Sequence, residues 1–159
     1  MTGNQYRRLV AQYLLFSHGA RGLQIYEEVS LGTSIIGKQR RVDLLVLLPS
    51  TGEALALECK YQDSSGTTDE KIPYALEDLK ALRIPAVIAY AGSGWSDGVL
   101  HLLQSSSLAA YCLPEEPFEP RPRKQGDPID SGTWQLDHVI AQTFRWWDVV
   151  LQGRTPLAP

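Results

Sequence analysis

Two apolar runs joined by a short polar turn occupy residues 41–62, RRVDLLVLLPSTGEALALECKYQ. Each run has the length of one strand, and the connecting PSTGE contains the proline and glycine that are typical of a tight turn. We therefore predict a hairpin of two strands over residues 41–48 and 54–62. The first run is apolar at almost every position, which predicts cover on both of its faces.

Three charged residues, Asp43, Glu58 and Lys60, interrupt these runs. A charge in an apolar strand is costly unless it is paired or holds an ion. Side chains alternate along a strand, so Glu58, Lys60 and Gln62 share one face. A register centred near residue 51 sets Asp43 opposite a residue close to 59. We expect Asp43 and Glu58 to face one site at the open end of the hairpin.

The remaining apolar patterns predict helices that alternate with strands. A helix is expected over about residues 4–17, a strand over 23–31, a helix that starts near Thr67 or Thr68, a strand in IPAVIAYAG, a helix in SDGVLHLLQSS and a strand in LAAYCL. A last helix is expected from Trp134 to Gln152, with Trp147 in the core and Trp146 at an interface. This order indicates an α/β domain with a mixed central sheet flanked by helices.

The chain divides into three parts by composition. Residues 1–113 carry the α/β pattern and are interpreted as the core. Residues 114–132 are rich in proline and charge and predict a linker or surface arm. Residues 133–159 predict an amphipathic helix and tail, packed on the core or on a partner subunit.

Overall composition, at 43% hydrophobic and 21% charged residues in 159, favours one soluble globular domain. The apolar runs are far shorter than the roughly 18 residues of a membrane span. Cys59 and Cys112 lie in strand-like runs, which predicts buried, reduced thiols in a cytoplasmic protein. The three histidines lack the spacing of zinc ligands.

The net charge of −3 argues against binding nucleic acid through bulk charge, but two local basic clusters are present. One contains Lys38, Arg40 and Arg41, and the other contains Arg121, Arg123 and Lys124. Either cluster can contact phosphates or form a solvated turn, and the sequence leaves both interpretations open.

The pattern of VD, a turn and ECK resembles the PD-(D/E)xK nuclease superfamily, whose core is the restriction-endonuclease-like fold. The resemblance covers about residues 4–111 and includes the order of helices and strands. It places Asp43 at the family's metal-binding aspartate, Glu58 at its second acid and Lys60 at its lysine. Val42 stands where the motif has proline. An upstream acid, which many members use, would be Glu27 or Glu28, and we prefer Glu28 because Glu27 alternates with apolar residues.

The resemblance implies a metal-dependent DNA endonuclease of the restriction, homing, resolvase or repair type. Two carboxylates beside a lysine suit Mg²⁺, with Mn²⁺ as a substitute, and Gln62 would position water or phosphate. One site cuts one strand, so we expect a homodimer, with the last helix as a candidate interface. The alternative is an inactive DNA-binding or recombination accessory protein on the same fold. A small-molecule-binding α/β protein is disfavoured because no phosphate-binding glycine motif is present.

Overall fold

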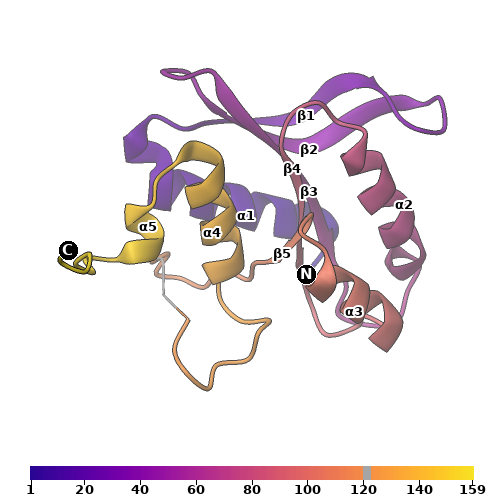
Figure 1. Ribbon diagram of the computed structural model, residues 1–159. Coiled ribbons are helices and arrows are strands. Elements are labelled where there is room, and N and C mark those ends of the chain that lie inside the picture. Colours follow the sequence, from indigo (N-terminus) through magenta and orange to yellow (C-terminus); the bar gives the residue numbers. More distant parts are fainter. Residues whose placement is uncertain (120–122) are drawn as a thin grey trace.

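The computed structural model describes residues 1–119 and 123–159 as five strands packed between helices (Figure 1). The elements in chain order are α1 (Gly3–His18), a short 3-10 helix η1 (Gly19–Arg21), β1 (Gln24–Thr33), β2 (Gln39–Leu48), β3 (Glu53–Tyr61), α2 (Thr68–Lys80), β4 (Ala86–Ala91), α3 (Asp97–Ser105), β5 (Ala109–Tyr111), α4 (Trp134–Phe144) and α5 (Asp148–Leu151). The sequence-based boundaries of the first eight predicted helices and strands agree with these to within a few residues, apart from η1, which was not expected.

The sheet has the order β1-β2-β3-β4-β5. The β1, β2 and β3 strands are antiparallel, whereas β4 pairs parallel to β3 and β5 pairs parallel to β4. The predicted mixed sheet is therefore confirmed. The β1–β2 hairpin projects along one side of the molecule, and its tip lies near the carboxyl end of α2 (Figure 1).

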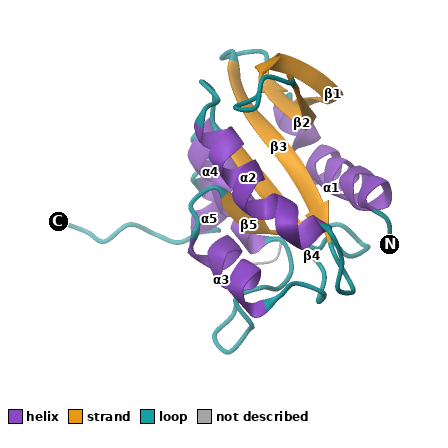
Figure 2. Cartoon of the chain, turned by 90° about the vertical axis from the view of Figure 1, so that its right-hand side faces the viewer, coloured by secondary structure: helices purple, strands orange, loops and turns teal. Residues whose placement is uncertain are grey.

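Helices cover both faces of the sheet, with α2 and α3 on the near side in Figure 2, and two hydrophobic cores lie between helices and sheet. On one face, α1 and α4 contribute side chains such as Tyr6, Val10 and Ile140 to the first core. On the other, α2 and α3 contribute Ile72 and Leu103 to the second. Burial of this apolar surface is the main stabilising term of such a layered domain.

The β2 strand is covered more on one face than on the other. Val46 and Leu48 on its first face are buried, but Leu45 and Leu47 on the second are only half-buried. Cover was predicted on both faces, and the second face is only partly covered, because α2 and α3 pack chiefly against β4 and β5 rather than against β2.

The predicted helix from Trp134 to Gln152 is broken into α4 and α5 at Arg145, whose φ of 62° ends the first of them. The break changes the direction of every later side chain. Trp146 packs against the first core, and Trp147 is 51% exposed. The expectation that Trp147 would be the core residue was therefore wrong.

Helix α4 packs on the chain's own core, and polar contacts fix it to α1. Tyr13 Oη donates to Asp137 Oδ1 (2.6 Å), and Thr133 Oγ1 donates to Asp137 Oδ2 (2.9 Å). His18 Nε2 lies 3.7 Å from the same carboxylate. All four of these side chains are buried. The network joins residues far apart in sequence and gives the buried Asp137 carboxylate hydrogen-bond donors in place of water.

Cys59 and Cys112 are buried free thiols, as predicted. Burial raises the pKa of both thiols well above the ordinary value, which keeps them neutral and unreactive. None of the described helices is long and apolar enough to cross a membrane.

Candidate functional site

The hairpin register brings the two predicted acids together. Leu44 pairs with Leu57 and Leu48 with Glu53, so Asp43 follows in line opposite Glu58, one residue from the predicted position. Paired residues of neighbouring strands point to the same face. Asp43 Oδ2 also accepts a hydrogen bond from the Cys59 backbone N–H (2.7 Å), which orients the carboxylate toward β3.

Glu58 carries the most perturbed carboxyl group of this site. Burial, followed by the neighbouring Asp43 carboxylate, raises the pKa of Glu58 from 4.5 to about 8. Lys60 acts in the opposite direction, but it does not offset the first two causes. Without a cation, the Asp43–Glu58 pair therefore retains a proton near neutral pH.

Lys60 lies two residues beyond Glu58 on the same face of β3. Its Nζ atom is 3.7 Å from Glu58 Oε2, and the two side chains are 24% and 17% exposed. This distance allows attraction but exceeds a direct hydrogen bond. The ammonium is therefore close to Glu58 yet still free to contact a ligand from solvent.

The chemistry of this donor set fits a hard divalent cation. When a cation binds, two adjacent carboxylates that share a proton would release that proton to solvent and become fully ionised. Within the described residues there is no group of three or more His, Cys, Asp or Glu side chains arranged for metal binding. Mg²⁺ suits such a sparse site, because it is commonly held by one or two carboxylates together with waters and substrate phosphate.

Glu28, the predicted upstream acid, lies across from Asp43 but is directed elsewhere. The pairs Glu27–Leu44 and Val29–Val42 flank it in β1, and its own φ of 52° interrupts the regular ladder. Its Oε1 atom is 3.3 Å from Arg7 Nη1 of α1. A left-handed glutamate within a strand is unusual and costly. The structure thus places Glu28 beside the site without joining it to Asp43 and Glu58.

Gln62 is buried and links two loops next to the site. Its Nε2 atom donates to the Gly94 carbonyl (2.8 Å), and its Oε1 atom accepts from the Asp69 N–H (3.2 Å). A side chain at Gly94 would collide with the Ser64 backbone, so the close approach of Gly94 to Ser64 requires glycine. In this arrangement Gln62 orients the start of α2, and its predicted contact with water or phosphate stays a prediction.

The basic cluster at the β1–β2 hairpin, formed by Lys38, Arg40 and Arg41, contains two kinds of residue. Lys38 and Arg41 are exposed. Arg40 is buried, and its guanidinium donates to both carboxylate oxygens of Asp78 in α2, at 2.9 and 3.1 Å. That contact holds the pKa of Asp78 below its ordinary value. Arg40 therefore fastens the hairpin to α2, while Lys38 and Arg41 stay available to a ligand.

Asp78 is the residue beside the site that the sequence did not reveal. It is 38 positions from Arg40 and lies among polar residues of α2, where the helical pattern predicts a solvated face. The pairing arises from the approach of the hairpin to α2, which no local pattern encodes. In the second basic cluster, Arg123 and Lys124 are exposed, and Arg121 lies outside the described residues.

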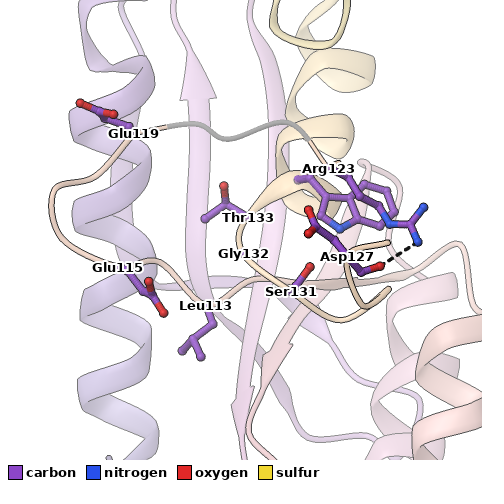
Figure 3. A pocket seen from close by; sticks show the side chains of 9 residues that line it. Leu113, Glu115, Glu119, Arg123, Asp127, Ser131, Gly132 and Thr133 are labelled. Atoms are coloured by element: carbon purple, nitrogen blue, oxygen red, sulfur yellow. Dashed lines mark hydrogen bonds between the residues drawn. The ribbon is translucent and has the colours of Figure 1, made fainter. Parts of the chain in front are cut away.

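A separate hollow of about 240 Å³ is lined by residues of the segments 113–119 and 123–134 (Figure 3). Its lining includes Glu115, Asp127 and Thr133, and Arg123 donates to the Asp127 carbonyl at 3.0 Å. None of the five predicted catalytic residues lines this hollow. The paired acids and the raised pKa of Glu58 point instead to the β2–β3 hairpin.

Comparisons with known proteins place the chain in a family. A family model described as "PD-(D/E)XK nuclease superfamily domain" matches residues 2–147, a range that includes α1, the whole sheet and α4. A comparison with curated proteins found no match.

Two solved structures are similar over part of the chain. AF1548, a protein of unknown function, is 14% identical over 67% of this chain, with a TM-score of 0.45. A repair endonuclease from Pyrococcus abyssi is 14% identical over 65%, with a TM-score of 0.38. The chain spans 56% and 44% of these two proteins, less than two thirds of each. Because the family model matches nearly the full length, the chain belongs to the PD-(D/E)xK nuclease superfamily.

Proposed function

We propose that the protein is a metal-dependent DNA endonuclease that hydrolyses phosphodiester bonds. The observation that carries the proposal is the placement of Asp43 and Glu58 on facing positions of β2 and β3, with Lys60 Nζ 3.7 Å from Glu58. Membership of a nuclease superfamily supports DNA as the substrate. The exposed Lys38, just before β2, and Arg41, on β2, supply positive charge for the phosphate backbone.

Each residue has a distinct role in this reaction. Asp43 and Glu58 would hold Mg²⁺, or Mn²⁺ in its place, and the Cys59 N–H keeps the first carboxylate oriented. The bound cation would supply Lewis-acid activation of water and phosphate. Lys60 is placed to orient the attacking water and to stabilise negative charge that develops on the phosphate in the transition state. Gln62 and Glu28 are proposed to position these groups indirectly, through α2 and α1.

The decisive experiment is incubation of purified protein with supercoiled plasmid and Mg²⁺, with EDTA as a parallel sample. An endonuclease converts the supercoiled form to nicked and linear DNA, whereas an enzyme that needs a free end leaves it intact. Asp43→Asn is the matched control for contaminating nuclease. Plasmid that stays supercoiled while gel shifts show DNA binding would instead identify an inactive DNA-binding protein on the same fold.

We further propose that two copies act together on duplex DNA, because one site faces one strand at a time. Trp147 and Leu151 at the carboxyl end are 51% and 50% exposed and offer apolar surface for such an association. Light scattering after size exclusion, with and without Trp147→Gln, tests the dimer. Linear product that appears only after nicked product accumulates would argue for independent monomers.

A further inference from the structure

The tip of the β1–β2 hairpin presents two adjacent isoleucines to solvent. The turn runs from Ser34 to Gly37 and is closed by a hydrogen bond from the Gly37 N–H to the Ser34 carbonyl (3.0 Å). Ile35 and Ile36 occupy its two central positions and are 50% and 58% exposed. Both side chains therefore lie at the far end of the hairpin.

These residue types are unusual for a turn. Central turn positions favour Gly, Pro, Asn, Asp and Ser, which adopt turn conformations easily or bond their own backbone. Isoleucine has neither property, and it gains nothing from solvent contact. Local folding does not explain the pair, so a ligand that covers the tip is the simpler explanation.

The tip is rigid rather than a loose loop. The Ser34 N–H donates to the Lys38 carbonyl (2.6 Å), and the Lys38 N–H donates to Ser34 Oγ (3.2 Å). The Ile35 N–H donates to Asp78 Oδ1 of α2 (3.0 Å), the same carboxylate that Arg40 engages. The hairpin is thus anchored to α2 at its tip and along its edge, and little ordering is needed when a ligand binds.

The charge around the tip is positive. Lys38 and Arg41 are exposed and form none of the ion pairs found in the described part of the chain. Arg83 is also exposed and lines a hollow with Arg40 at the foot of the hairpin. The nearby acid, Asp78, is neutralised by Arg40. The apolar tip with exposed cations beside it therefore complements DNA, which combines a negatively charged backbone with apolar stacked bases.

The spacing from the tip to the acids has the scale of DNA. Asp43 is seven positions after Ile36 along the hairpin. A fully extended chain covers at most about 23 Å over that length, at roughly 3.3 Å per residue. Base pairs stack about 3.4 Å apart, so this length corresponds to at most about seven base pairs.

From these observations we propose that Ile35 and Ile36 form an apolar wedge that enters the stack of duplex DNA within about seven base pairs of the scissile phosphate. The proposal deepens the proposed endonuclease function and rests on it. Apolar side chains of this kind can separate base steps and kink a duplex. The enzyme would then prefer DNA that is easily deformed, and the deformable position would determine where it cuts.

The test uses the full-length protein and a 40-bp duplex that contains one two-nucleotide bulge. Cleavage positions in Mg²⁺ are mapped on denaturing gels for wild type, for Ile35→Thr/Ile36→Thr and for Leu15→Gln. Threonine keeps the β-branch, and Leu15 is a matched control because it is 48% exposed on α1, on the opposite face of the sheet. Binding is measured by anisotropy in the non-cleaving Asp43→Asn background.

Wild type and Leu15→Gln should cut mainly at one position within about seven base pairs of the bulge, and the double variant should lose this clustering. The double variant should also bind the duplex at least about tenfold more weakly, because burial of one isoleucine is worth roughly that factor or more. Its salt dependence should be unchanged, since no phosphate contact is lost. Equal clustering and affinity in all three proteins would overturn the wedge but leave the endonuclease intact. A wild type that neither binds nor cuts DNA would overturn both.

Discussion

Replacement of Glu58 by glutamine should make the apo-protein more stable at high pH. Glutamine has the shape of a protonated glutamate but cannot ionise. Wild-type Glu58 has a folded pKa of about 8, raised from 4.5 by burial and by Asp43. Between these values the folded state binds more protons than the unfolded state, so the free energy of unfolding falls as pH rises. Each pKa unit corresponds to about 1.4 kcal/mol, which gives a ceiling of about 5 kcal/mol above pH 8.

Denaturant unfolding from pH 4.5 to pH 9 in EDTA measures this effect. Wild type should lose about 2–5 kcal/mol across the range relative to Glu58→Gln, because relaxation and sharing of the proton with Asp43 reduce the ceiling. The two proteins should be nearly equal at pH 4.5. Glu53→Gln is the matched control, since it makes the same chemical change on the same strand outside the site.

Addition of Mg²⁺ provides the second arm of the same experiment. A cation bound at 100 times its Kd stabilises the folded state by about 2.7 kcal/mol. This gain should appear in wild type at pH 8 and be much smaller in Glu58→Gln. Parallel stability curves for the two proteins at every pH would refute the buried acid pair. Equal stabilisation of both by Mg²⁺ would place the cation elsewhere.

Four further predictions concern the site and its support. Asp43→Asn should abolish plasmid cleavage and leave the thermal melting of the apo-protein unchanged or higher, because one repelling charge is removed; retained cleavage would contradict the assignment. Lys60→Ala should slow single-turnover cleavage by about 100- to 1,000-fold with unchanged melting, whereas lowered melting with preserved cleavage would indicate only a structural role. Ca²⁺ should bind yet support little turnover compared with Mg²⁺, which calorimetry and cleavage rates in each ion would check. Asp78→Ala should cost about 1.5–3 kcal/mol in urea unfolding, because Arg40 loses a charged partner, while the exposed Glu77→Ala should cost far less.

The hairpin and its acid pair were predictable because their information is local. A five-residue turn with proline and glycine sets the register, and alternation then fixes the face of Asp43, Glu58 and Lys60. The prediction differed from the structure by one residue. The mixed sheet followed from the order of periodic segments, which is also local information.

Features that depend on tertiary contacts could not be read in the same way. The left-handed conformation of Glu28 has no sequence signal, since glycine or asparagine would be expected there. The break at Arg145 also has no sequence signal, because the apolar spacing continues through it and either Trp146 or Trp147 could face the core of an unbroken helix. Arg40 was grouped with Lys38 and Arg41 by proximity in sequence, and only the approach of α2 separates them.

The positions of the positive charges near the β2–β3 hairpin explain why the pair of Asp43 and Glu58 lacks a strong cationic partner. Two arginines come close to this region, but each contacts another acid: Arg40 contacts Asp78, and Arg7 contacts Glu28. A guanidinium on Asp43 or Glu58 would pair with the acids permanently and keep both of them ionised. Instead, the described residues provide only Lys60, at 3.7 Å, which is too weak a partner to keep Glu58 ionised. Both arginines are thus engaged by other acids, and Asp43 and Glu58 are left without a strong cationic partner. A divalent ion with a phosphate ligand would supply the missing positive charge.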